Sequence, residues 1–256
     1  MKKLLGLTLA FAALLVMVGC GDEVALDTPD VTYIVDATDE GGTLTLDWVE
    51  IADADGYYII ADGVAIDTLD DPATITYDAT TPAAVYGVQA YAGEDVSGTD
   101  EIDCAPVVTT GLDVWDMSEP PPNPSGFGFA ASGTASAYSV SDSTNWPLID
   151  YYIESGPQEF WSPHHGGWNT EVNVTVNSGS TDFDACTIAD APGGYSTQTG
   201  IASGAVYYFW IDPTNNGWDD ATDYFGKIIV TAVSGTQVTM TLAYQPIAGL
   251  RWVVTD

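Results

Sequence analysis

The sequence predicts an all-β protein with two consecutive antiparallel domains. Short runs rich in Val, Ile, Thr, Tyr and Trp recur between Gly, Asp and Pro residues, and helical periodicity is absent beyond the N-terminal leader. Hydrophobic residues make up 46% and aromatic residues 11% of the chain, which is enough to bury real cores in spite of the charge. The prolines in residues 118–125 favour an extended conformation and separate two groups of strand-like runs.

These observations divide the chain into five parts. We expect a signal peptide at 1–19, a tether at 20–27, a first β domain at 28–110 and a second β domain at 126–256. Residues 111–125 are either a semi-rigid linker or the opening segment of the second domain.

The first domain begins with an alternating strand at residues 43–48. Leu44, Leu46 and Trp48 fall on two-residue spacing there and should face a core. Next come a strand at 54–60, a hairpin turn at Asp62-Gly63 and a strand at 86–91. This order and spacing resemble a fibronectin type III domain over residues 28–108. The resemblance implies a seven-stranded sandwich that acts as a spacer or an adhesive module, and it implies no active site.

Seven of the eight tryptophans lie in residues 112–256, with Trp48 alone in the first domain, and the chain ends in a series of hairpins. We expect strands at 150–153, 205–211, 224–233 and 237–244, with a turn at Ser234-Gly235 before the last. Four segments resemble the C-terminal half of the HmuY-like β-rich surface lipoproteins: 191–195, 207–210, 225–230 and 239–245. The resemblance implies a second antiparallel β-rich domain whose motifs are structural rather than catalytic.

Founding members of that family bind haem through two histidines on separate loops, which clamp the iron from opposite faces. The only histidines here, His164 and His165, are adjacent in the sequence. Neighbouring side chains cannot reach opposite faces of one porphyrin, so this departure argues against haem capture.

The N-terminus predicts export and lipid anchoring. Lys2 and Lys3 precede an uncharged apolar run that is shorter than the roughly 20 residues of a membrane span and ends at Cys20. Residues 17–20 resemble the bacterial lipobox, although Met17 is less usual than Leu at its position. We therefore expect cleavage before Cys20 and a lipid on its sulfur, which places the protein in the cell envelope, facing the periplasm or the cell exterior. An ordinary signal peptide and an uncleaved anchor are the alternatives.

The charge is strongly negative. The chain has 37 Asp and Glu against 4 Lys and Arg, a net charge of −33, and loss of the two leader lysines takes this to −35. Such a surface repels nucleic acid and excludes a DNA or RNA role. It attracts divalent cations or cationic partners, or it reflects adaptation to a saline environment.

Two cysteines remain beyond the lipidation site, in a compartment that permits disulfides. Cys104 and Cys186 are either paired across the domain boundary or two free buried thiols.

Aromatic residues crowd the stretch from Trp146 to Trp168. Exposed, they would form a stacking platform for a sugar or an apolar ligand; buried, they would be core. Trp161 and Trp168 are flanked by Pro and Gly in a loop that also holds His164 and His165, and these four residues are the ligand-binding candidates.

Residues 212–223 have the ligand spacing of a calcium loop. Oxygen ligands fall on Asp212, Thr214, Asn216, the Trp218 carbonyl, Asp220 and Asp223, with Gly217 at the sharp turn. Pro213 and the flanking strands depart from the usual helix-flanked loop, and a polar hairpin tip is the alternative interpretation.

The chain lacks a G-x-S-x-G elbow, a zinc-ligand spacing and a phosphate-binding loop. The sequence thus favours a non-enzymatic envelope lipoprotein that binds an extracytoplasmic ligand or protein partner, with Ca²⁺ as its candidate cofactor. A structural or adhesive surface protein is the alternative, and a secreted polysaccharide hydrolase is a third.

Overall fold

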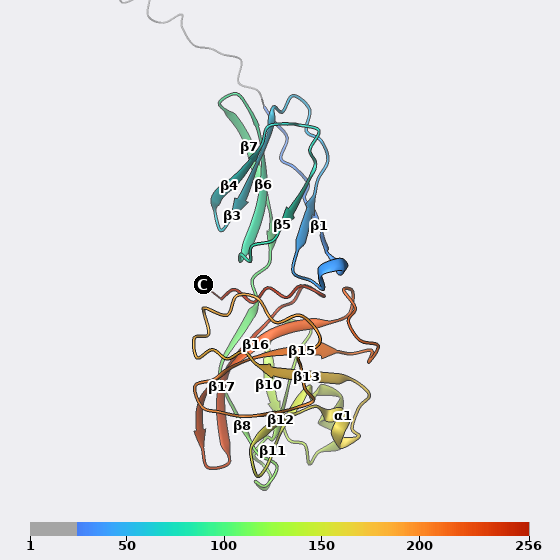
Figure 1. The fold of residues 1–256 in the computed structure, drawn as a ribbon, viewed down its shortest axis with the longest axis vertical. Coiled ribbons are helices and arrows are strands. Elements are labelled where there is room, and N and C mark those ends of the chain that lie inside the picture. Colours follow the sequence, from blue (N-terminus) through green and yellow to red (C-terminus); the bar gives the residue numbers. More distant parts are fainter. Residues whose placement is uncertain (1–24, 256) are drawn as a thin grey trace, which may run out of the picture.

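The structure, a computed structural model, describes residues 25–255. The predicted signal peptide, Cys20 and the first part of the tether lie outside these residues. The predicted all-β fold is confirmed: the described chain forms four antiparallel sheets with three short helical turns. Figure 1 shows two β-sandwiches stacked end to end along the long axis of the molecule. No helix within the described range is long and apolar enough to cross a membrane.

The first sandwich has seven strands in two sheets, with the orders β1-β2-β5 and β4-β3-β6-β7. Its strands are β1 (Thr32–Val35), β2 (Leu44–Asp47), β3 (Gly56–Ala61), β4 (Val64–Leu69), β5 (Thr76–Ala79), β6 (Val85–Ala92) and β7 (Asp95–Asp103), and η1 (Ala37–Asp39) follows β1. As the alternation predicts, Leu44, Leu46 and Trp48 are buried in the core between the sheets. The turn between β3 and β4 has positive φ at both Asp62 and Gly63, the conformation that a two-residue hairpin needs.

The second sandwich has two five-stranded sheets, with the orders β10-β9-β11-β12-β14 and β13-β15-β16-β17-β8. Its strands are β8 (Val107–Trp115), β9 (Gly126–Phe129), β10 (Ala135–Tyr138), β11 (Tyr151–Glu154), β12 (Glu159–Trp161), β13 (Val172–Asn177), β14 (Gln198–Gly200), β15 (Val206–Asp212), β16 (Tyr224–Ser234) and β17 (Gln237–Tyr244). Two short helices lie in its connections, η2 (Ser143–Leu148) and α1 (Pro163–Gly166).

The core of the second sandwich lies between its two sheets. Alternate residues of β15 contribute to different clusters: Tyr207 and Phe209 pack against the other sheet, whereas Tyr208 packs beneath the 178–197 connection. A strand that is buried on both faces reads as a continuous apolar run, and this explains the sequence from Val206 to Ile211.

The chain passes from the first sandwich to the second at residues 104–106. Strand β8 already pairs with β17 along its length, so it belongs to the second sandwich. The proline-rich residues 118–125 therefore lie inside the second sandwich, between β8 and β9, and the crossing point precedes residues 111–125, for which the sequence left a linker and a domain entry open.

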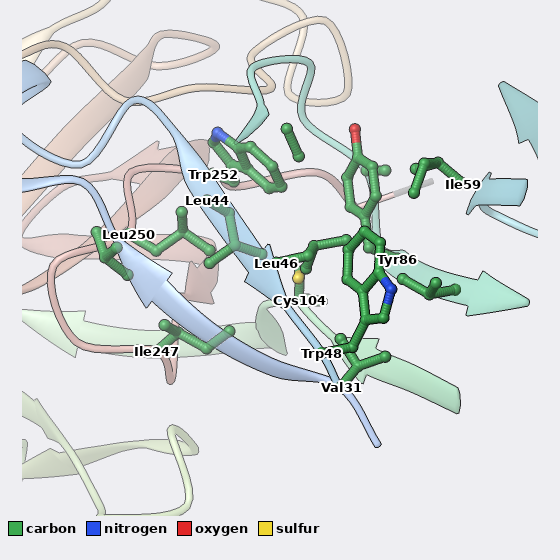
Figure 2. Close-up of a cluster of buried hydrophobic side chains, with 14 of the residues drawn as sticks. Val31, Leu44, Leu46, Trp48, Ile59, Tyr86, Cys104, Ile247, Leu250 and Trp252 are labelled. Carbon is green, nitrogen blue, oxygen red and sulfur yellow. The ribbon is translucent and has the colours of Figure 1, made fainter. Parts of the chain in front are cut away.

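The C-terminal strap, residues 245–255, joins the two sandwiches. It follows the last strand of the second sandwich, yet Ile247, Leu250 and Trp252 are buried in the core of the first (Figure 2). The ring of Trp252 lies 5.6 Å from that of Tyr86, and its Nε1 donates to the carbonyl oxygen of Gly42 over 2.9 Å.

Polar groups complete this junction. Arg251 donates from Nε to Glu40 O and from Nη1 to Ala189 O, each over 2.7 Å, so that its guanidinium bonds a carbonyl of each sandwich. The buried Gln245 donates from Nε2 to Cys104 O and to Trp252 O. Because apolar burial and hydrogen bonds both cross the boundary, we expect the two sandwiches to behave as one rigid body.

Candidate functional site

Four of the aromatic side chains from the 146–168 stretch form a contiguous row with His165 on the outer face of the sheet that contains β11 and β12. Trp146 stacks on Trp168 with ring centroids 5.8 Å apart, and Trp168 lies 4.6 Å from Tyr152. Tyr152 lies 5.9 Å from Trp161, which in turn lies 5.3 Å from His165. We call these five residues the aromatic row.

The pleat of the strands produces this face. Tyr151, Ile153 and Phe160 point into the core between the sheets, so Tyr152 and Trp161, which are register partners, point outward. Tyr152 is buried beneath its neighbours, whereas the three tryptophans are half-buried and His165 is exposed. Tyr152 therefore forms the buried base of the row, and the other four rings are accessible to a ligand.

The loop after β12 positions two members of the row. Pro163 occupies the first turn of α1, where its missing N–H costs no hydrogen bond, and Gly167 ends the helix in the left-handed conformation with φ of 68°. A Cβ at Gly166 would lie only 2.6 Å from the Trp168 ring, so the glycine allows that ring to lie against the helix.

The two histidines do not share one role. His165 bonds Thr197 Oγ1 through Nε2 over 2.7 Å and contacts Trp161, whereas His164 is exposed on α1. Both lie on the same four-residue helix, α1.

The half-buried Asp150 lies directly before β11, and its carboxyl group is largely removed from water. Asp150 accepts a hydrogen bond from Phe129 N at Oδ2, and Asn173 Nδ2 donates to its backbone oxygen over 2.9 Å. Burial raises the pKa of Asp150 to about 7, and the nearby Glu171 carboxylate raises it further. Burial likewise raises the pKa of Glu171. The fully buried Asn173 has no hydrogen-bond partner at Oδ1 among the described residues.

The 212–223 loop is organised by its own hydrogen bonds. Asp212 accepts from Thr214 N at Oδ1 and from Gly217 N at Oδ2, while Asp223 Oδ2 accepts from Trp210 Nε1 and Asp219 N. The carboxylates at both ends of the predicted calcium loop thus already stabilise its backbone.

Two other predicted calcium ligands of this loop, Asn216 and Asp220, contact other residues of the protein. Asn216 donates from Nδ2 to Asp219 Oδ2 over 3.4 Å, and the backbone of Asp220 lies against Gly249 in the strap. Within residues 25–255, no group of three or more His, Cys, Asp or Glu side chains is arranged to hold a metal ion. Calcium binding here stays a prediction.

The same loop also supports the junction. Asp223 O accepts a hydrogen bond from Gly249 N over 2.7 Å, and the Trp218 ring lies close to Gly41 of the first sandwich. Burial raises the pKa of Asp223 to about 6, with a further contribution from Asp212. Its hydrogen bonds from Trp210 and Asp219 act in the opposite direction.

The two cysteines are not bonded to each other. Cys104 belongs to the core of the first sandwich, whereas Cys186 belongs to the cluster beneath the 178–197 connection of the second. Both are free and buried, which corrects the predicted disulfide. The reason is that each thiol packs in a separate apolar cluster, so the alternative of two buried thiols holds.

A shallow surface cavity of about 340 Å³ lies beside the row, between the proline-rich segment and residues 139–141. Trp146 Nε1 donates to Val140 O in its wall, which connects the cavity to one end of the row. Sequence reasoning did not anticipate this cavity, and no local motif marks it.

No protein-family model and no curated protein matches the sequence. Among solved structures, one described as FN3tt mut is 21% identical, covers 30% of this chain and 92% of its own length, and has a TM-score of 0.25. A DUF4466 family protein from Parabacteroides merdae ATCC 43184 is 14% identical, covers 86% of this chain and 98% of its own, and has a TM-score of 0.38. Both scores are too low to carry a functional argument.

Proposed function

We propose that this chain is a non-enzymatic cell-envelope lipoprotein that binds an extracytoplasmic ligand through the aromatic row. The row carries the proposal, because five contacting rings on one sheet face, four of them half-buried or exposed, form a rigid apolar platform with polar edges. Aromatic rings of this kind supply contact area at low entropic cost. The resemblance to HmuY-like surface lipoproteins supports a ligand-binding role for this sandwich.

The remaining parts have simpler roles in this proposal. A lipid on Cys20 tethers the chain to the membrane, and the first sandwich holds the second away from it. Ca²⁺, if it binds residues 212–223, stabilises the fold and takes no part in chemistry.

A structural or adhesive role is the second candidate, and the junction favours it. The strap buries Trp252 in the first sandwich and bonds both sandwiches through Arg251, which suits a protein that must transmit force or keep a fixed length.

The test is a binding screen of the purified mature chain against neutral glycans, haem and small amines. Saturable binding without turnover, lost in Trp161→Ala with Trp168→Ala, supports the proposal. The matched control is Trp218→Ala, which removes a half-buried indole of the 212–223 loop. Absence of binding to every member of the panel would contradict the proposal and favour the structural role. Equal binding by the Trp161→Ala with Trp168→Ala variant and by Trp218→Ala would do the same.

A further inference from the structure

The outer face of β11 and β12 combines an aromatic pair with a carboxylate pair. The strand register places Tyr152 opposite Trp161 and Glu154 opposite Glu159, and all four side chains point outward. Burial raises the pKa of Tyr152 and the Glu154 carboxylate raises it further, and Glu159 Oε2 accepts a hydrogen bond from Trp161 Nε1 over 2.8 Å. Two rings and two carboxylates therefore lie in one compact patch, which includes two central members of the aromatic row.

The carboxylate pair is unfavourable by itself. Like charges directly opposite on neighbouring strands repel each other, and the chain offers few cations to relieve them. Among residues 25–255, the only Lys and Arg are Lys227 and Arg251. Lys227 Nζ donates to Phe183 O and Cys186 O, and Arg251 lies at the junction. Glu154 Oε1 accepts hydrogen bonds from Ser155 N and Oγ, and Glu159 Oε2 accepts one from Trp161 Nε1. These neutral donors leave both negative charges in place, so a cation from solution would balance them.

Trp161 suits a cation for a second reason. Its indole N–H is already bonded to the Glu159 carboxylate, so a ligand meets the carbon face of the ring rather than the N–H. A hydrogen bond from the N–H to an anion also makes the ring more electron-rich. Each cation held over such a face gains about 0.5–2 kcal/mol.

We propose that this patch binds a small ammonium ligand with apolar substituents, such as a quaternary amine. The charged nitrogen lies over the Trp161 ring and near the two carboxylates, and its alkyl groups contact the aromatic row. Anionic ligands are repelled by the same carboxylates. This inference names the ligand class of the proposed binding function and rests on it.

The experiment compares two ligands of the same shape. Calorimetric titration of the mature chain with choline should show saturable binding in the roughly millimolar range, whereas 3,3-dimethylbutan-1-ol, its uncharged isostere, should bind at least 5-fold more weakly. Glu159→Gln should weaken choline binding at least 5-fold. Glu101→Gln, which removes an exposed carboxylate from the first sandwich, should leave it unchanged.

Two results would overturn the inference. Equal binding of choline and its isostere would show that the row recognises shape without charge. Equal weakening by Glu159→Gln and Glu101→Gln would assign choline uptake to the whole acidic surface. In either case a Trp161-dependent glycan or haem signal in the binding screen would leave the proposed function standing. Because Glu159 is half-exposed, its replacement should not unfold the protein, and an unchanged thermal midpoint checks this.

Discussion

Replacing Trp252 tests whether the last residues of the chain complete the core of the first sandwich. Trp252 is fully buried, and its Nε1 is bonded to Gly42 O. Trp→Ala in a core costs about 3–5 kcal/mol. Leaving the Gly42 carbonyl oxygen without its partner adds about 1 kcal/mol. Against a typical total of about 5–15 kcal/mol, Trp252→Ala should remove a large share of the stability.

The measurement is urea unfolding of the mature protein followed by circular dichroism, together with limited proteolysis. We expect a lower midpoint for Trp252→Ala, with the new cleavage sites in the first sandwich, more than 100 residues upstream of the substitution in the sequence. Trp161→Ala is the matched control because it removes the same side chain from a half-exposed position, and it should cost under about 1 kcal/mol. A loss below about 1 kcal/mol for Trp252→Ala, or cleavage confined to the second sandwich, would refute the strap as part of the first core.

Four further predictions concern protons, the anchor, salt and calcium. Burial raises the pKa of Asp150 to about 7, so the folded state holds its proton more tightly than the unfolded chain does. The free energy of unfolding should therefore rise by up to about 4 kcal/mol as pH falls from 8 toward 4. Unfolding curves recorded at several pH values should show a smaller rise for Asp150→Asn than for the wild type. Cys20→Ser should move the protein out of the detergent phase or leave an unprocessed precursor, and unchanged partitioning would contradict lipidation. The thermal midpoint should rise with NaCl as the Debye length shortens from about 10 Å at 0.1 M to about 3 Å at 1 M, and a flat midpoint would mean that the acidic residues are too dispersed to repel. Calorimetry should show calcium uptake at roughly 10⁻⁴–10⁻³ M that Asp212→Ala with Asp223→Ala lacks, whereas equal uptake would assign it to the diffuse acidic surface.

The strands were predictable because their signals are local. The alternation in residues 43–48 became β2 with its apolar side inward, and Asp62-Gly63 formed the turn between β3 and β4. The continuous apolar run that became β15 needed only its length and its β-branched and aromatic residues to be read as a buried strand.

The position of the strap could not be predicted, because its contacts are with residues far away in the sequence. Leu250 and Trp252 flank Arg251 in a short segment after the last hairpin, but nothing in it specifies a core whose other members lie about 150 to 220 residues away. The same limit applies to the cysteines, since spacing along the chain does not reveal which cluster each thiol joins. The proline-rich segment left two interpretations open, because prolines mark a break in pairing as readily inside a domain as between two.

The candidate site was predictable in composition but not in geometry. Local crowding singled out Trp161, Trp168 and the histidines, and the structure brings Trp161, Trp168 and His165 together. Two features of the site could be seen only in the three-dimensional structure. They are the stacking of Trp146 on Trp168 and the register that places Glu154 opposite Glu159. A β-hairpin pattern at 151–161 would have suggested the register, had the turn between the strands been recognised.

The charge of the whole molecule and the chemistry of the row act at different ranges. The carboxylates of residues 25–255 attract any cation from a distance, and this attraction is screened by salt. Contact with the Trp161 ring is short-ranged and depends much less on ionic strength. Salt should therefore weaken choline binding at the Glu154–Glu159 patch without abolishing it, whereas cation uptake that disappears completely at 1 M NaCl would come from the surface charge alone. The residual binding at high salt thus measures the part of the affinity that the aromatic row itself contributes.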